Sequence, residues 1–229
     1  GLDFLEISNH FNEDEIMVQH TTREFVDNEI IPIIEEHFEN ATFPDHLIEK
    51  FADMGFFGMN LPEKYNCAGM SNIEFGLVCY VLERGDCGIR CFVSVQGALV
   101  MYPIFAYGSE EQRKYWLPKL ASGEKIGCFG LTEPNFGSNP GGMITTAKKV
   151  KDGYLLNGAK MWITNGTVAD VAVVWAKTDD GVVRGFLVEK GMEGFSAPMM
   201  KNKWSLRASV TSELIFDNVF VPEENLLPN

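Results

Sequence analysis

The stretch from residue 127 to residue 142, GCFGLTEPNFGSNPGG, contains residue types that suit a phosphorylated ligand. Its first half is small and apolar and ends before a proline, a pattern that predicts a short buried strand followed by a loop. Thr132 would then offer a hydroxyl and a backbone N–H at the end of the strand. Gly137 has no Cβ, so the backbone could approach a phosphate closely, and Ser138 adds a hydroxyl beside it.

A second stretch, residues 162–165 (WITN), could complete such a site. Trp162 offers a flat apolar wall and Thr164 another hydroxyl. The residue type alone favours a core position for Trp162, but its place directly before Ile163-Thr164-Asn165 favours the flavin. A flavin needs donors along its polar rim, a wall for its ring and fixed N–H groups for its pyrophosphate. The two stretches therefore predict a flavin site. An ordinary hairpin is the alternative, and the chain contains neither G-x-G-x-x-G nor a P-loop.

One arginine, Arg90, interrupts an apolar stretch, and Ser94 lies four residues further on, on the same face of a helix. A planar guanidinium can hold a carboxylate through two parallel hydrogen bonds, which predicts an anchor for a free carboxylate on a ligand. A structural ion pair with Glu83 or Asp86 is the alternative, because a buried arginine usually has an internal partner.

The composition indicates a globular chain with a substantial core. Its 229 residues are 45% apolar and 12% aromatic, enough for one large domain or two small ones. The net charge of −13 argues against binding to nucleic acid or to an anionic membrane, which requires clustered Lys and Arg. We find no run of about 18 apolar residues and no signal segment, so neither a membrane span nor export is expected. Gly1 in place of Met, and the end at Asn229, suggest a piece of a longer chain.

The cysteines and histidines do not suggest a metal site. The five cysteines form no C-x-x-C pair, and all four histidines lie within the first 46 residues. We therefore expect no metal and reduced, partly buried thiols in a cytosol-like compartment. The cysteines are Cys67, Cys79, Cys87, Cys91 and Cys128.

The first half of the chain carries helix signals throughout. Asn12, Ser71 and Ser109 are each followed three residues later by Glu or Gln, the pattern of a capping box. A nearly uncharged segment at 91–101 predicts a helix that is buried on all sides.

Prolines and glycines divide these helices. Pro32 should kink or interrupt the first one, and another helix is expected between Pro44 and Gly55. We expect residues 1–125 to form an all-helical N-terminal domain.

After Gly127 the apolar pattern changes to a period of two, in short segments rich in β-branched and aromatic residues. Asp-Gly pairs at 152–153 and 180–181 indicate hairpin turns. Short strands without intervening helices predict an antiparallel sheet or barrel over residues 126–229, so the fold class is a two-domain α+β protein. The expected strands are 143–150, 153–158, 159–164, 171–178, 182–189 and 213–216.

Four motifs, in order, resemble the acyl-CoA dehydrogenase family and, within it, the glutaryl-CoA dehydrogenases. The likeness covers nearly the whole chain from about Phe11. It implies the family's helical N-terminal domain and β middle domain, with the C-terminal helical bundle of the family absent. The motifs are LTEPNFGSN, YLLNGAKMWITN, GFLVEKGMEGFSAP and SLRASVTSELIFDNVFVPEENLLP.

The resemblance implies FAD as cofactor and an acyl-CoA thioester as substrate. Ser138 would touch both ligands. Asn139 stands where much of the family has Asp, so a charge near the pyrophosphate is lost while the loop shape should persist. The residues that would line FAD are Phe129, Leu131, Thr132, Gly137, Ser138, Trp162, Ile163 and Thr164.

The resemblance also implies where the substrate would bind. In the glutaryl-CoA dehydrogenases, one motif faces the distal end of the acyl chain, and four residues of this sequence match it. The match favours Arg90 as the anchor of a terminal carboxylate. Cys91 stands where Ser is commoner, so one contact of the substrate differs. These substrate residues are Glu83, Arg90, Cys91 and Ser94.

No catalytic residue is assigned within this chain. The family removes the substrate proton with a carboxylate on a later helical domain, so Glu133 is not assigned as a base. Lys201, Lys203 and Arg207 are expected on a solvated surface, with a contact to a CoA phosphate as the alternative.

The activity that the resemblance implies is α,β-dehydrogenation of glutaryl-CoA, with decarboxylation to crotonyl-CoA. Thr132 and Thr164 would stabilise negative charge on the flavin rim. Electrons would pass to an electron-transfer flavoprotein, and the full-length protein would be a homotetramer in the bacterial cytoplasm or the mitochondrial matrix. Two alternatives are a dehydrogenase or oxidase for another short-chain acyl-CoA, and a non-catalytic FAD- or CoA-binding fragment.

Overall fold

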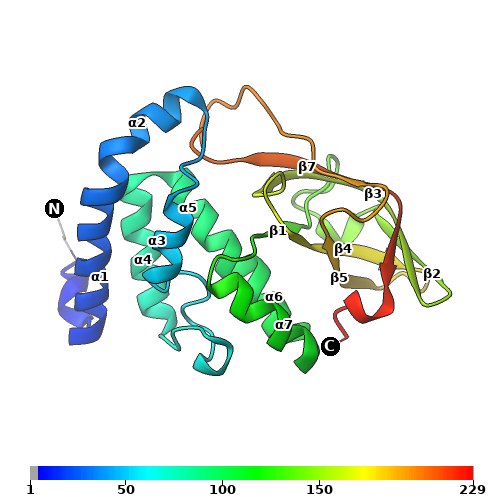
Figure 1. The fold of residues 1–229 in the computed structure, drawn as a ribbon, viewed down its shortest axis with the longest axis horizontal. Helices are drawn as coiled ribbons and strands as arrows, with labels where there is room; N and C mark the ends of the chain where they lie inside the picture. The colour runs from blue at the N-terminus through cyan, green and yellow to red at the C-terminus, as the bar shows by residue number, and fades with distance from the viewer. Residues whose placement is uncertain (1–4, 229) are drawn as a thin grey trace.

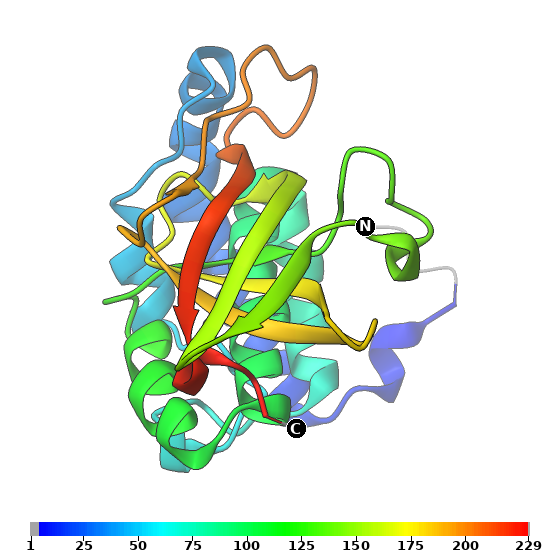
Figure 2. The same ribbon diagram turned by 90° about the vertical axis from the view of Figure 1, so that its right-hand side faces the viewer.

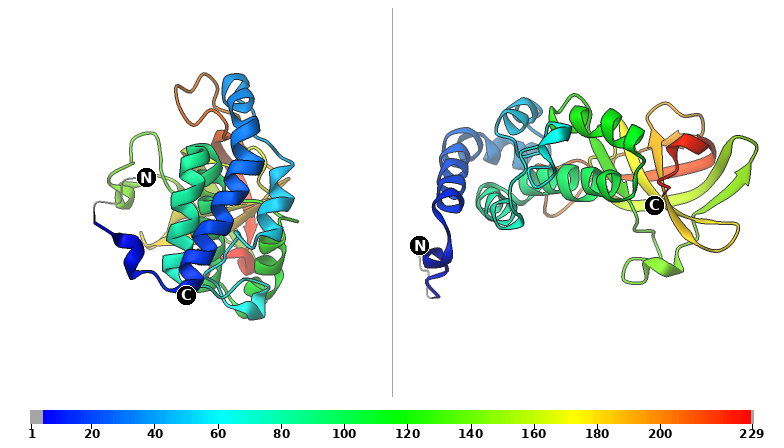
Figure 3. Two further views of the ribbon diagram at one scale, coloured as in Figure 1. Left: turned by 90° about the vertical axis from the view of Figure 1, so that its left-hand side faces the viewer. Right: turned by 90° about the horizontal axis from the view of Figure 1, so that it is seen from below.

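A layer of helices lies beside a twisted β sheet (Figure 1). The structure is a computed structural model that describes residues 5–228, so Gly1 and Asn229 lie outside the described residues. Viewed from below, the molecule is elongated, with the helices at one end and the sheet at the other (Figure 3). The predicted order, helices first and strands second, is confirmed.

Capping boxes begin three of the helices, as predicted. The side chains of Asn12, Ser71 and Ser109 each accept a hydrogen bond from the backbone N–H three residues on, and the Glu or Gln at that position accepts one in return. The helices are α1 Glu13–Phe25, α2 Ile31–Asn40, α3 Leu47–Asp53, α4 Asn72–Gly85, α5 Cys87–Ser94, α6 Tyr102–Tyr107 and α7 Glu110–Ala121.

Two prolines are accommodated by π-helical turns. Val26–Ile30 precedes α2, which has Pro32 in its first turn, and Val95–Met101 precedes α6, which has Pro103 in its first turn. Proline lacks an N–H and clashes with the carbonyl four residues earlier, so a wider turn ahead of it keeps the helical path continuous. The interruption predicted at Pro32 is therefore a widened turn.

One helical stretch, Cys87–Tyr107, corrects two expectations. With 21 residues it is long and apolar enough to cross a membrane by length and composition, although no such segment was expected. Within the structure 56% of its most apolar window is buried, because the stretch forms part of the core between the helices and the sheet. It is not buried on all sides, since Leu99 remains 40% exposed.

Residues 5–228 contain seven strands, in the order β1-β4-β2-β3-β7-β6, and β5 also pairs with β4. Most pairs are antiparallel, but β4 runs parallel to β1 and to the start of β2. The sheet is therefore mixed where an antiparallel one was predicted, because the long β3 carries the chain across the sheet before β4 returns. The strands are β1 Gly127–Gly130, β2 Thr146–Val150, β3 Gly153–Thr164, β4 Val171–Thr178, β5 Val183–Glu189, β6 Phe195–Ser196 and β7 Thr211–Pro222.

A loop leaves the sheet and returns to the same strand. Residues 127–130 pair with the first half of β4, and residues 146–147 pair with its last two residues. The intervening residues 131–145, which we call the excursion loop, project from the sheet as the green loop in Figure 2. Both ends of this loop are thus attached to β4.

Gln96 joins the helices to the sheet at the start of β1. Its side chain is fully buried, and Nε2 donates to the carbonyls of Leu120 (3.0 Å) and Lys125 (2.9 Å), while Oε1 accepts from the Gly127 N–H (2.8 Å). Gly127 also packs tightly, because a Cβ there would lie 2.3 Å from Val100. The position of β1 on the helical layer is therefore fixed by both hydrogen bonds and packing.

Candidate functional site

The two stretches predicted to form a flavin site lie side by side. The Met161 N–H donates to the Thr132 carbonyl (2.8 Å), and the Asn165 side chain donates to the Gly127 carbonyl (3.5 Å). The end of β1 and the first residues of the excursion loop therefore run along the end of β3. This places Thr132 in the same region as residues 162–165.

Trp162 lies on a β-bulge and points away from the core. The pairing of β3 with β7 shifts between Lys160 and Ile163, and Trp162 adopts a left-handed backbone with φ of 64°. This conformation costs about 1–3 kcal/mol for a bulky residue, and such strain is concentrated at functional sites. The indole is 60% exposed, so the bulge directs an apolar wall outward.

The two threonines present hydroxyl groups at this edge. Thr132 and Thr164 are half-buried, and within residues 5–228 neither hydroxyl is hydrogen-bonded to the protein. Ile163 differs, because its side chain is only 3% exposed and packs in the sheet core, which leaves only its backbone for a ligand.

Phe129 and Leu131 are half-buried beside the same edge. The Phe129 ring packs edge-on against Trp175, with centroids 6.3 Å apart. Gly137 and Ser138 lie further along the excursion loop and are exposed. A Cβ built on Gly137 would have no neighbour within 4 Å, so the space beside its backbone is open.

A buried ion pair involves Glu133, the residue that follows Thr132 in the chain. Lys160 Nζ is 2.8 Å from Glu133 Oε1, and the two side chains are 0% and 1% exposed. The carboxylate also accepts from the backbone N–H groups of Ile144 (2.7 Å) and Thr145 (3.0 Å). Burial raises the pKa of Glu133, but the Ile144 N–H, the Lys160 ammonium and Thr145 together lower it to about 2. A carboxylate this acidic and this enclosed is unsuited to act as a general base.

Arg90 is held by two neighbours on the helices. Its Nε donates to Glu83 Oε2 (2.7 Å) and its Nη1 to Ser94 Oγ (3.3 Å), and the Glu83 carboxylate holds the pKa of Arg90 above its usual value. Within the described residues Nη2 makes no hydrogen bond to the protein, and the side chain is 33% exposed. Cys91, next to it, is half-buried and accepts from the Ser94 hydroxyl through its carbonyl (3.2 Å).

The basic group near the end of the chain is not a simple solvated surface. Residues 197–210, which we call the clasp segment, cross from the sheet to the helices and appear in orange in Figure 1. Arg207 donates to the carbonyls of Phe38 (2.9 Å) and Glu39 (2.8 Å), and so caps the end of α2. Lys203 is half-buried and donates to three oxygens of the clasp segment and β7. Only Lys201 is exposed as predicted.

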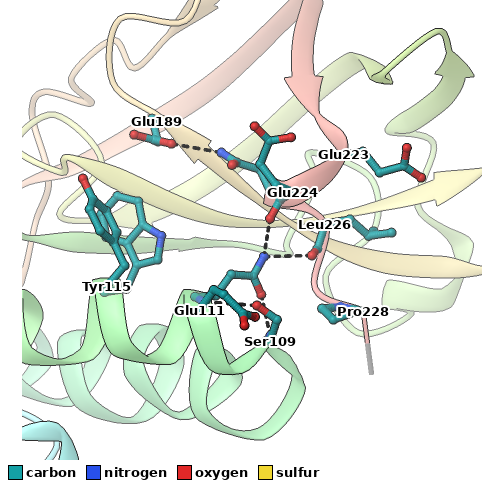
Figure 4. A pocket seen from close by; sticks show the side chains of 11 residues that line it. Ser109, Glu111, Tyr115, Glu189, Glu223, Glu224, Leu226 and Pro228 are labelled. Atoms are coloured by element: carbon teal, nitrogen blue, oxygen red, sulfur yellow. Dashed lines mark hydrogen bonds between the residues drawn. The ribbon is translucent and has the colours of Figure 1, made fainter.

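A hollow lies away from these residues, between α7 and the turn after β7 (Figure 4). It measures about 490 Å³ and is lined by Tyr115 and by four carboxylates. These negative charges would repel the phosphates of a flavin or of CoA, so the hollow does not suit either ligand. The carboxylates belong to Glu111, Glu189, Glu223 and Glu224.

The five cysteines are free thiols, and within residues 5–228 no group of three or more His, Cys, Asp or Glu side chains could hold a metal ion. Burial raises the pKa of Cys128 to about 12, and those of Cys67 and Cys79 to about 11. Because only the thiolate reacts, we expect all three thiols to react slowly, the buried Cys67 and Cys128 as well as the half-buried Cys79.

We expect Cys128 in the native protein to remain unmodified by a thiol-specific alkylating reagent at about pH 8, while it reacts fully in denaturant. Peptide mass spectrometry after a timed reaction would measure this. Half-buried Cys87 serves as the internal control and should react faster. Equal rates for the two cysteines in the native protein would show that the strand β1 opens readily.

Lys160 and Gln96 were not identified from the sequence as site or junction residues. A signal for Lys160 exists, because it follows Leu156 and Gly158 at a spacing of two and so points to the same, inner face of β3. A lysine at an inward position requires a buried anion, and Glu133 supplies it. Gln96 lies in the apolar helix and has no comparable sequence signal.

Comparison with known proteins follows the same division of the chain. Residues 12–124 match the family described as "Acyl-CoA dehydrogenase, N-terminal domain", and residues 128–219 match "Acyl-CoA dehydrogenase, middle domain". An acyl-CoA dehydrogenase of Bacillus subtilis is 39% identical over 95% of this chain and 59% of its own length. The mitochondrial short-chain specific acyl-CoA dehydrogenase of Sus scrofa is 35% identical over 92% of this chain and 52% of its own.

Solved structures are similar over nearly the whole chain. A glutaryl-CoA dehydrogenase from Mycobacterium smegmatis, in complex with FADH2, superimposes with a TM-score of 0.96 and 52% identity, over 99% of this chain and 58% of that one. A glutaryl-CoA dehydrogenase in complex with glutaryl-CoA gives a TM-score of 0.91 and 34% identity, over 96% and 57%. A chain in a structure titled as the electron transferring flavoprotein of Acidaminococcus fermentans gives 0.91 and 36%, over 96% and 59%.

A helical layer followed by a mixed half-barrel sheet, with both domain matches in sequence order, defines the class. The chain belongs to the acyl-CoA dehydrogenase family. It spans between about half and three fifths of the length of the relatives named above.

Proposed function

We propose that the protein containing this chain is an FAD-dependent acyl-CoA dehydrogenase that acts on glutaryl-CoA. The observation that carries the choice of substrate is Arg90, a partly exposed guanidinium that Glu83 and Ser94 hold in place and whose Nη2 has no protein partner among residues 5–228. A guanidinium of this kind suits a terminal carboxylate. The 52% identity to the M. smegmatis glutaryl-CoA dehydrogenase agrees with that choice.

The residues at the end of β3 and in the excursion loop fit FAD. Trp162 offers an exposed wall at a strained bulge, and the hydroxyls of Thr132 and Thr164 are available to the polar rim of the ring. The open backbone beside Gly137, with Ser138 next to it, would receive the pyrophosphate. Phe129 and Leu131, together with the backbone of Ile163, complete the edge.

Bound FAD would supply a two-electron acceptor for oxidation of the acyl chain. The residues of this chain would orient the substrate around it. Arg90 would hold the distal carboxylate beside Cys91 and Ser94, and Ser138 would contact the acyl-CoA. Thr132 and Thr164 would donate to the side of the ring where negative charge develops, and each such donor would stabilise the transition state by about 3 kcal/mol. Loss of the carboxylate as carbon dioxide after oxidation would give crotonyl-CoA.

We place the helical domain at residues 1–125 and the β domain at residues 126–229. No catalytic base is assigned in this chain, and the proton acceptor is expected on a further domain of the full-length protein.

We also propose that electrons pass to an electron-transfer flavoprotein, that the full-length protein is a homotetramer, and that it acts in the cytoplasm or the mitochondrial matrix.

A second candidate is dehydrogenation of a short-chain acyl-CoA without a distal carboxylate. Glu83 already neutralises Arg90, and among the curated relatives is a short-chain specific enzyme. Under this alternative Arg90 would be a structural ion pair.

Anaerobic titration of the full-length protein with glutaryl-CoA and with butyryl-CoA tests the choice. We expect glutaryl-CoA to bleach the flavin absorbance, and crotonyl-CoA and carbon dioxide to form once an electron acceptor is added. Bleaching by butyryl-CoA alone would favour the short-chain alternative. Oxygen consumption during turnover would indicate an oxidase, and no bleaching by either ester would indicate a non-catalytic protein.

A further inference from the structure

The buried Glu133–Lys160 pair has no role in the function proposed above. Both side chains are almost completely enclosed, and their charged atoms are 2.8 Å apart. Removing two charges from water costs about as much as their attraction returns, so such a pair is a poor source of stability by itself. Its contacts with the surrounding backbone suggest a different role.

The Glu133 carboxylate closes the neck of the excursion loop. Glu133 stands near the beginning of the loop, and it accepts hydrogen bonds from Ile144 and Thr145 at the end of the loop. The Thr145 carbonyl in turn accepts from Lys177 N on β4 (2.9 Å). One carboxylate therefore holds the two ends of the loop together against the sheet.

Lys160 attaches the same carboxylate to β3. Its ammonium also donates to the Leu131 carbonyl (3.2 Å), and the next residue, Met161, donates its N–H to the Thr132 carbonyl (2.8 Å). These two successive residues of β3 immediately precede the bulge at Trp162. The ion pair thus connects three parts: the end of β1, the neck of the excursion loop and the bulge.

We propose that Glu133 and Lys160 are positioning residues of the flavin site, which set Thr132 against the Trp162 edge and hold the neck of the loop that carries Gly137 and Ser138. This inference rests on the proposed FAD function. The covalent structure of FAD limits the distance between its ring and its pyrophosphate. The Thr132–Trp162 edge, which would hold the ring, and the loop with Gly137 and Ser138, which would hold the pyrophosphate, must therefore be kept at a matching distance. Glu133 lies between those parts in the chain. Its carboxylate contacts the backbone at the end of the loop, and Lys160 links it to the Leu131 carbonyl at the beginning.

The charge and the two oxygens of Glu133 are both required for this role. The carboxylate receives three donors, namely two backbone N–H groups and one ammonium. A glutamine of the same shape has one acceptor oxygen and turns its NH2 group toward a donor. In Glu133→Gln the neck should therefore open even though the volume is conserved.

The test compares FAD affinity with thermal stability in the full-length protein. For Glu133→Gln and for Lys160→Met, we expect the dissociation constant for FAD, measured by titrating the apoprotein with FAD, to rise about tenfold or more, with a changed visible spectrum of the bound flavin. In Glu133→Gln/Lys160→Met both charges are absent, so the melting temperature should recover toward that of the wild type. FAD affinity should stay weak, because the single oxygen of glutamine leaves one of the Ile144 and Thr145 N–H groups without an acceptor.

Val221→Ala is the matched control for loss of stability. Val221 is fully buried in the sheet core on β7, whereas Lys160 lies on β3 and Glu133 in the excursion loop. It should lower the melting temperature without changing the dissociation constant for FAD. If the variants that remove a charge do not fold, Glu133→Asp is the alternative. It keeps the charge and shortens the side chain by one methylene, so it should weaken FAD binding less than Glu133→Gln does.

Two results would overturn the inference while leaving the proposed function intact. One is an unchanged dissociation constant for FAD in single variants that have lost stability. The other is full recovery of FAD affinity together with stability in the double variant. If the wild-type protein itself does not bind FAD, the proposed function fails and this inference fails with it.

Discussion

Arg90→Gln in the full-length protein is expected to lower kcat/KM for glutaryl-CoA about a hundredfold, which corresponds to about 2.7 kcal/mol. The variant loses two charge-assisted hydrogen bonds to the terminal carboxylate, each worth about 1.5–3 kcal/mol. It also leaves Glu83 as an uncompensated negative charge close to that carboxylate. Because butyryl-CoA has no distal carboxylate, its kcat/KM should change by less than about threefold. Steady-state kinetics with both esters measures the ratio.

Arg84→Gln provides the matched control for this experiment. Arg84 is also an arginine of the helical layer that pairs with a carboxylate, since its Nη1 lies 2.6 Å from Asp27 Oδ1. Both side chains of that pair are 44% exposed, so its loss should cost little and should leave the ratio of the two substrates unchanged. An equal loss of activity toward both esters in Arg90→Gln would identify Arg90 as a structural ion pair.

Gln96→Leu is expected to destabilise the protein by about 4 kcal/mol, which would lower the melting temperature by about 10 °C. The volume is nearly conserved, so the loss comes from hydrogen bonds. The Lys125 carbonyl and the Gly127 N–H would be left buried without this partner, whereas the Leu120 carbonyl would keep its hydrogen bond from the Gly123 N–H (3.3 Å). An unpaired buried group costs about 1–3 kcal/mol, so two such groups account for most of the loss.

Gln19→Leu is the control for Gln96→Leu. Gln19 is half-exposed on α1, and the same substitution there should change the free energy of unfolding by no more than about 0.5 kcal/mol. Thermal unfolding followed by circular dichroism measures both variants. A loss below about 1 kcal/mol in Gln96→Leu would mean that water replaces the amide at the junction.

Local signals in the sequence predicted most of the elements. The capping boxes at Asn12, Ser71 and Ser109 begin helices where expected, because each uses only four consecutive residues. The period of two located β4 correctly and β5 within one residue. The strands expected at 153–158 and 159–164 are instead the single strand β3. The alternation of apolar and polar residues shows where the side chains change from one face of the sheet to the other, but it does not show that the strand continues through a bulge.

Features that depend on distant residues were missed. The parallel pairing of β4 with β1 is set by where the chain returns after β3, which no local pattern records. The short β6 pairs with β7 across 21 positions of chain, and there the Phe195 ring stacks on Phe216 with centroids 5.4 Å apart. The sequence indicated Trp162 as a candidate wall, but its left-handed backbone follows from the register of β7.

The site residues show the same limit. Thr132, Trp162 and Thr164 were predicted as site residues from residue type, since hydroxyls and an indole have recognisable uses, and they stay a prediction. The partnership of Glu133 with Lys160 joins residues 27 positions apart, and only the fold brings them within reach. Arg207 and the Phe38 carbonyl on α2 are 169 positions apart in the sequence. Because no local pattern records this contact, the basic residues of the clasp segment were expected on a solvated surface.

The excursion loop has a consequence for how members of such a lineage can diverge. Strand β1 pairs with residues 171–174 of β4, and β2 pairs with residues 177–178 of the same strand. The register of both strands on β4 is therefore independent of the number of residues in the excursion loop between them. Lengthening or shortening residues 135–142 should therefore be tolerated by the scaffold, because the cost of closing a longer surface loop grows only slowly with its length. Ancestral variants could have altered ligand preference at this detour while the rest of the architecture stayed constant.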